Sequence, residues 1–280
     1  MPSSQRFRRP VSHLPSLVTL GNLACGVGAI LLSIQAAMGE GDPIKLYHAA
    51  WWLFLASVLD GLDGKVARMT NSMSSLGAQL DSFADAITFG VAPTVMLSTL
   101  VFLVAPDLGI QLHPRLLMVA PIIYSCCAIL RLARYNIEHE SEDLSQDNPG
   151  FSGLPSPGAG GLPITMVLLY FGLQDTALFV VSDTLLHTIQ LALVWSAPYV
   201  TIVLGILMVS RVPYPHFFSW VTRHRSPVRA LAEVVVLAGL LMVEPEIALF
   251  LSIVLYIFIP PLLHAPFLFR ANSEEAAHES

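Results

Sequence analysis

The chain has 280 residues, of which 54% are hydrophobic and only 12% charged, and its mean hydropathy is +0.66. Soluble domains carry about 25% charged residues, so this composition excludes an ordinary soluble protein and predicts an integral membrane protein. A formal net charge of -6 and the lack of a basic surface pattern exclude nucleic acid as a partner. The three cysteines have no CxxC spacing, which excludes a common form of zinc site.

Long apolar runs without period-2 alternation predict membrane-spanning helices. Lipid cannot satisfy free backbone groups, and a bilayer core needs roughly 20 helical residues. We therefore predict an all-α, polytopic membrane bundle of about eight spans with a core of six. In chain order these are residues 15–37, 47–68, 77–103, 116–136, 162–181, 187–210, 228–243 and 247–268. The glycines and prolines in the segment from Asp143 to Gly161 predict one long loop or re-entrant segment.

The basic residues orient these predicted spans, because Lys and Arg collect on cytoplasmic flanks. With the amino terminus inside, only Lys45 and Arg115 of the 14 basic residues fall on the outer side. We therefore expect both termini in the cytoplasm. We also expect the protein to lie in the inner (cell) membrane, with its active site facing the cytoplasm.

Four aspartates lie where the second and third predicted spans meet the cytoplasm. Asp60 and Asp63 are three residues apart, and Asp81 and Asp85 are four apart, so each pair lies on one face of its helix. The short loop 69–76 makes the two spans antiparallel neighbours. Both pairs then lie at a similar depth, one to two helical turns below the cytoplasmic surface.

Carboxylates this close raise one another's pKa unless a cation neutralises them. Oxygen ligands favour a hard divalent ion, Mg²⁺, Mn²⁺ or Ca²⁺, and such an ion also binds phosphate oxygens. The pattern thus indicates phosphoryl chemistry on a substrate reached from the cytoplasmic leaflet. Two alternatives stay open: helix packing, and the ion path of a non-enzymatic cation-coupled carrier.

The aspartates belong to a longer pattern, D-x-x-D-G-x-x-A-R, eight residues, then G-x-x-x-D-x-x-x-D. This pattern resembles the signature of the CDP-alcohol phosphatidyltransferase family at every fixed position. The resemblance implies a helical membrane enzyme that joins a small alcohol to the phosphate of a CDP-linked lipid, uses a divalent cation and releases CMP. The fixed positions are Asp60, Asp63, Gly64, Ala67, Arg68, Gly77, Asp81 and Asp85.

Further segments are similar to the branch of this family that uses serine. That branch implies CDP-diacylglycerol and L-serine as substrates and phosphatidylserine and CMP as products. Glycerol 3-phosphate and inositol remain alternative acceptors. The segments are SLVTLGNLACG from Ser16, FADAITFGVAP from Phe83, RLARYNIE from Arg131, FSGLPSPGAGG from Phe151 and VSRVPYPHF from Val209.

The resemblance implies a role for each aspartate. Asp60, Asp63 and Asp81 hold the metal, Mg²⁺ or Mn²⁺. Asp85 is the general base for the serine hydroxyl and a further candidate metal ligand. The residues expected around the nucleotide of the CDP-lipid are Asp60, Gly64, Ala67, Arg68, Gly77 and Asn22.

Two arginines form the candidate acceptor site. Arg131 and Arg134 lie about one helical turn apart at the cytoplasmic end of the fourth predicted span. A guanidinium matches the serine carboxylate or the lipid phosphate in a forked geometry. The alternative interpretation is a pair of charges that only orients the span.

The chain divides into four expected parts. Residues 1–14 form a cytoplasmic segment and 15–217 the CDP-alcohol phosphatidyltransferase membrane domain. Residues 218–270 add further transmembrane helices, and 271–280 form a disordered tail. The resemblance also implies a homodimer in the lipid membrane.

Overall fold

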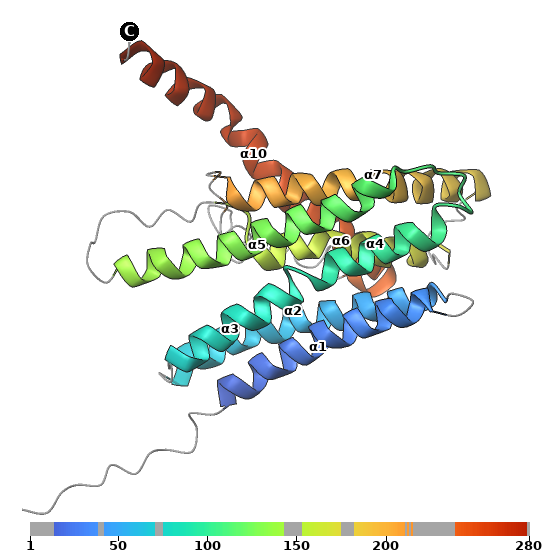
Figure 1. Ribbon diagram of the computed structural model, residues 1–280, viewed down its shortest axis with the longest axis horizontal. Helices are drawn as coiled ribbons and strands as arrows, with labels where there is room; N and C mark the ends of the chain where they lie inside the picture. The colour runs from blue at the N-terminus through green and yellow to red at the C-terminus, as the bar shows by residue number, and fades with distance from the viewer. Residues whose placement is uncertain are drawn as a thin grey trace, which may run out of the picture.

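The computed structural model describes residues 14–38, 42–70, 75–142, 153–174, 182–210, 212, 214 and 239–278. Within these ranges, only the backbone is described at residues 14–16, 63–70, 75, 138–142 and 263–278. Its elements are all helices, most of which run along a common direction (Figure 1). They are α1 (Leu14–Ala37), α2 (Ile44–Thr70), α3 (Ser75–Thr88), α4 (Ala92–Val104), α5 (Pro114–Glu142), α6 (Ser156–Gly172), α7 (Asp183–Val209) and α10 (Pro245–His278).

The all-α class is confirmed for the described residues, and the chain is a multi-pass membrane protein. Five helical segments are long and apolar enough to cross a membrane. The 27 residues of α2 are also long enough, but they include the charged motif, while α6 has 17 residues. The count of eight spans is not confirmed, and most of the seventh predicted span, 228–243, lies outside the described residues.

The third predicted span, 77–103, corresponds to the candidate membrane span Leu76–Val104. It is interrupted by a turn at residues 89–91, between α3 and α4. Proline explains the break. Pro93 lies in the first turn of α4 and has no N–H to donate to the carbonyl of Phe89, four residues earlier. The buried Tyr124 hydroxyl of α5 donates to that carbonyl instead, at 2.9 Å. The turn leaves Asp85 in the last turn of α3.

The fifth predicted span, 162–181, begins too late, since α6 already starts at Ser156. Residues 156–161 are therefore helix and not the end of a long loop. Pro157 fits there because proline is tolerated in the first helical turn. The fourth predicted span also extends further, to Glu142 in α5.

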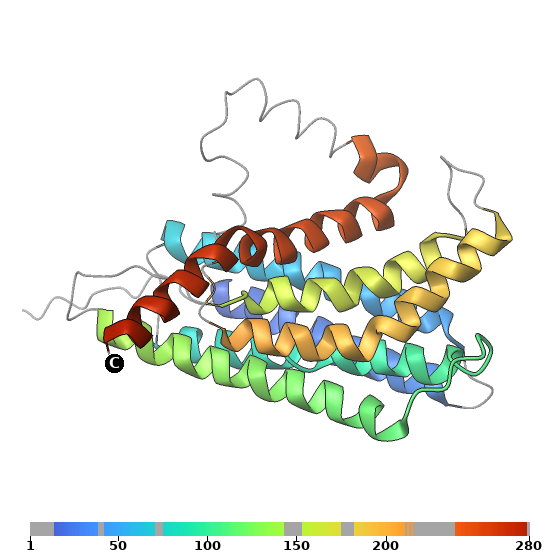
Figure 2. The same ribbon diagram turned by 90° about the horizontal axis from the view of Figure 1, so that it is seen from above.

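The eighth predicted span, 247–268, is longer in the structure, where α10 continues to His278. A disordered tail was expected over 271–280, but residues 271–278 are helical. Figure 2 shows α10 lying across one side of the bundle, where it contacts α6. The amino-terminal part of α10 also meets α2, because the Tyr47 hydroxyl donates to Glu246 at 2.9 Å.

Helices α1 and α3 approach each other closely at Gly26. A Cβ atom at this position would lie 2.5 Å from Thr88 Oγ1 and 3.0 Å from Thr88 Cα. The Thr88 hydroxyl donates to the carbonyl of Asn22 at 3.3 Å, one turn earlier in α1. The missing side chain at Gly26 therefore fixes how α1 lies against the helix that carries Asp81 and Asp85.

Replacing Gly26 by alanine should force α1 and α3 apart. Overpacking of this kind costs about 1–3 kcal/mol, which corresponds to a fall in apparent melting temperature of roughly 3–10 °C in detergent. Gly21→Ala is the matched control in the same helix, since its Cβ would meet Leu59 Cδ1 at an ordinary 3.5 Å. Equal melting temperatures for the two variants would contradict the close contact.

Candidate active site

Helices α2 and α3 bring three of the predicted aspartates together. One carboxylate oxygen from each of Asp60, Asp81 and Asp85 lies within 4.8 Å of the other two, and all three residues are partly buried. Asp81 and Asp85 are one turn apart on α3, as their spacing predicts. The antiparallel helix α2 supplies Asp60 from the other side.

These three residues fit a divalent cation. Their donor atoms are hard carboxylate oxygens, the ligands that Mg²⁺ and Mn²⁺ prefer. Partial burial limits the screening of their negative charge by water, so a positive charge between them is favourable. The fourth predicted ligand, Asp63, follows Asp60 by three residues in α2, but its side chain lies outside the described residues.

Asn22 brings α1 into this site. The side chain is fully buried, and its amide nitrogen donates to Asp85 Oδ1 over a long 3.4 Å. Its amide oxygen is also buried, with no hydrogen-bond partner among the described residues. A buried polar atom without a partner costs free energy, so the Asn22 oxygen marks a place where a donor from a substrate would be stabilised.

Arg131 reaches the site from α5. The structure gives it a favourable electrostatic interaction with Asp85, and its Nη1 donates to Ser156 Oγ at 2.8 Å. Its Nε is buried and makes no hydrogen bond within the described part of the chain. Arg134 follows one turn later on the same helix and is exposed, so the two predicted arginines differ in burial.

The remaining predicted residues surround the aspartates along the chain. Gly77 lies one turn before Asp81 on α3 and is partly exposed. Gly64, Ala67 and Arg68 continue α2 beyond Asp60, but their side chains lie outside the description. The structure thus brings Asp60, Asp81, Asp85, Asn22 and Arg131 into one region.

Sequence reasoning did not identify Ser156, the buried partner of Arg131. A signal for it was present, since serine before proline is typical of the start of a helix. The prediction of spans did not use this signal and left residue 156 in the segment from Asp143 to Gly161. The signal also gave no indication that the start of α6 would meet α5, because the contact joins residues 25 positions apart.

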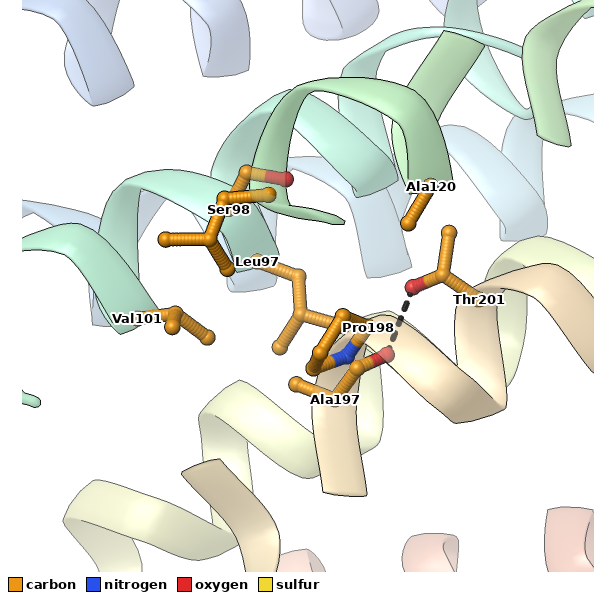
Figure 3. A pocket seen from close by; sticks show the side chains of 8 residues that line it. Leu97, Ser98, Val101, Ala120, Ala197, Pro198 and Thr201 are labelled. Carbon is orange, nitrogen blue, oxygen red and sulfur yellow. Dashed lines mark hydrogen bonds between the residues drawn. The ribbon is translucent and has the colours of Figure 1, made fainter. Parts of the chain in front are cut away.

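Two cavities lie away from the aspartates. The first, of about 10 Å³, lies between α4, α5 and α7 beside Pro198, where the Thr201 hydroxyl donates to the Ala197 carbonyl at 2.8 Å (Figure 3). It has room for about one water molecule. The second, of about 270 Å³, is lined by Tyr47, Glu244 and Glu246 among others. Neither includes a residue of the motif, so the candidate site is the aspartate cluster.

Comparisons with known proteins identify the family of this chain. Residues 12–207 match the family model described as CDP-alcohol phosphatidyltransferase. A CDP-diacylglycerol–serine O-phosphatidyltransferase of Bacillus subtilis is 32% identical over 207 residues, which cover 74% of this chain and 92% of the relative. The enzyme of the same name from Helicobacter pylori is 31% identical over 74% of each chain. The one from Mycobacterium leprae is 30% identical over 99% of this chain and 82% of the relative.

The family model covers well over half of the chain and includes every aspartate of the site. The structure adds the expected convergence of carboxylates from α2 and α3. The chain belongs to the CDP-alcohol phosphatidyltransferase family.

Proposed function

We propose that this protein transfers the phosphatidyl group of CDP-diacylglycerol to L-serine, which gives phosphatidylserine and CMP. The observation that carries the proposal is the convergence of Asp60, Asp81 and Asp85 beside Arg131 within the family-matched region. The curated relatives named for the same reaction support serine as the acceptor.

On the donor side, the aspartates hold a divalent cation, Mg²⁺ or Mn²⁺. When bound, such a cation supplies positive charge for the two phosphates of the donor. The four carboxylates Asp60, Asp63, Asp81 and Asp85 are its proposed ligands. The proposed contacts of the cytidine and ribose are Asp60, Gly64, Ala67, Arg68, Gly77 and Asn22.

On the acceptor side, Asp85 is the proposed general base. The serine hydroxyl gives its proton to the Asp85 carboxylate as its oxygen bonds to the lipid phosphorus, and CMP leaves with the electrons of the broken P–O bond. A positioned base contributes roughly 10²- to 10⁴-fold to such a step. The Asn22 amide, 3.4 Å from Asp85 Oδ1, holds the other side of this carboxylate.

Arg131 and Arg134 are the proposed acceptor site. The serine carboxylate is an anion that a guanidinium binds in a forked geometry, and the Arg131 Nε has no partner among described residues. Arg131 Nη1 donates to Ser156 Oγ at 2.8 Å, and the charge of Arg131 attracts that of Asp85. A small amino acid with a reactive hydroxyl requires an anion contact near the base, and the attraction between Arg131 and Asp85 supports this assignment.

We place the reaction at the cytoplasmic face of the inner membrane, because most basic residues flank that side. Asp81 lies near the start of the candidate membrane span Leu76–Val104, not at its middle, which disfavours a carrier with a mid-membrane ion site. Residues 15–217 would form the catalytic membrane domain, with residues 218–270 as an addition. A homodimer is part of the same proposal.

Purified protein in detergent should release CMP from CDP-diacylglycerol only when both Mg²⁺ or Mn²⁺ and L-serine are present. Chelation with EDTA should abolish release, and readdition of the metal should restore it. Glycerol 3-phosphate and inositol serve as comparison acceptors. Release with one of these and none with serine would assign a different acceptor. No release with any acceptor would favour the cation-coupled carrier.

Asp85→Asn should lower turnover by about 10²-fold or more, because the amide cannot accept the serine proton. CDP-diacylglycerol should still bind, since Asp60 and Asp81 remain. The matched control is Asp107→Asn, which changes an exposed aspartate in the turn after α4 and should keep full activity. Serine-dependent turnover at the wild-type level in Asp85→Asn would refute the assignment of the base.

A further inference from the structure

The main-chain carbonyl of Phe89 lies just after α3, where α5 and α6 both reach it. Pro93, four residues later, has no N–H to donate to this carbonyl. Helix α6 covers it at Gly160, where a Cβ atom would lie 3.4 Å from the Phe89 oxygen. Phe89 and Tyr124 are both fully buried, and lipid offers no hydrogen-bond donor. The carbonyl therefore depends on the Tyr124 hydroxyl of α5, which donates to it at 2.9 Å.

The turn that contains this carbonyl also binds the backbone of Asp85. The N–H groups of Phe89 and Gly90 both donate to the Asp85 carbonyl, at 2.9 and 3.2 Å. The conformation of the turn requires glycine at position 90, because a Cβ atom there would clash with the Ala86 carbonyl oxygen. Two successive hydrogen bonds through Phe89 thus join the Tyr124 hydroxyl to the backbone of Asp85.

Helix α1 holds the same end of α3 from another side. The Asn22 amide donates to Asp85 Oδ1 at 3.4 Å, and the Thr88 hydroxyl donates to the Asn22 carbonyl at 3.3 Å. Asn22 therefore contacts the carboxylate of Asp85, while Tyr124 supports its backbone. Both supports are needed to place one carboxylate oxygen for proton transfer, because a proton moves only over hydrogen-bond distance.

We infer that Tyr124 is a positioning residue for the proposed general base. Through the turn at residues 89–91, it fixes where Asp85 lies relative to the other aspartates and to the acceptor. This inference rests on the proposed function, because it concerns the base of that reaction. Tyr124 acts through Asp85 and needs no contact with either substrate.

The test is the steady-state kinetics of Tyr124→Phe, which keeps the buried ring and removes the hydroxyl. A buried carbonyl without a donor is unfavourable, so the turn should rearrange and shift Asp85 with it. A displacement of about 1 Å can cost 10²-fold in rate, and we expect kcat to fall roughly tenfold or more. The KM values for serine and CDP-diacylglycerol should stay at wild-type values. A wild-type kcat would overturn the inference.

Tyr47→Phe is the matched control, because it removes another tyrosine hydroxyl that joins two helices over 2.9 Å. Tyr47 lies in the first turn of α2, away from Asp60. The control should lower the apparent melting temperature and keep the wild-type kcat. An equal fall of kcat in Tyr47→Phe and Tyr124→Phe would reveal a general effect of packing and refute the positioning role.

A double variant separates positioning of the base from damage elsewhere. If Tyr124 acts through Asp85, adding Tyr124→Phe to Asp85→Asn should leave kcat where Asp85→Asn alone puts it, because residues that act as a unit are not additive. A purely structural role would lower kcat by the same factor in both backgrounds. A further tenfold loss in the double variant would therefore contradict the inference.

Gly90→Ala changes the same turn and leaves Tyr124 intact, so it provides the test if Tyr124→Phe does not fold. Its new Cβ would clash with the Ala86 carbonyl oxygen, which should displace Asp85 and lower kcat roughly tenfold or more with an unchanged KM for serine. A wild-type kcat in Gly90→Ala would likewise overturn the inference. Wild-type protein that releases no CMP with serine would instead refute the proposed function.

Discussion

Mutual repulsion of like charges is the constraint on which this structure depends. Oxygen atoms of Asp60, Asp81 and Asp85 lie within 4.8 Å of one another. Two unit charges at that separation repel by about 3 kcal/mol at an effective dielectric constant of 20. The folded bundle tolerates such a cluster when cations compensate it. The donor set suits a divalent ion, and Arg131 adds a positive charge on the side of Asp85.

Small residues and one proline allow the helices to come together around the aspartate cluster. Gly26 allows α1 to touch Thr88, which carries Asn22 to Asp85. Pro93 has no N–H to donate to the Phe89 carbonyl, and Tyr124 of α5 donates to that carbonyl instead. The contact between α5 and the turn joins the helix of Arg131 to the helix of Asp85. The chemistry of the site and the packing of the bundle therefore use the same contacts.

Features of the site that depend on the spacing of residues along the chain could be predicted from the sequence. Helical periodicity was enough to place Asp81 and Asp85 on one face, and the short connection was enough to predict that Asp60 of α2 would come close to them. It did not predict that α1 packs against both α2 and α3. The sequence did not predict that Arg131 and Arg134 would differ in burial, because the burial of each depends on how α5 is rotated against its neighbours. Hydropathy likewise did not predict the turn at residues 89–91, because it measures apolar character and not the backbone N–H that Pro93 lacks. The hydrogen bond between Arg131 and Ser156 joins residues 25 positions apart, which no local pattern encodes.

Binding of Mn²⁺ to the purified protein, followed by the paramagnetic resonance signal of the free ion, tests the central claim most directly. The account predicts saturable binding to the wild-type protein that is lost in Asp81→Asn, which removes one charge from the cluster. The exposed Asp107→Asn variant should bind as the wild type does. Saturable binding of equal strength in Asp81→Asn would contradict the assignment of these carboxylates as the metal site.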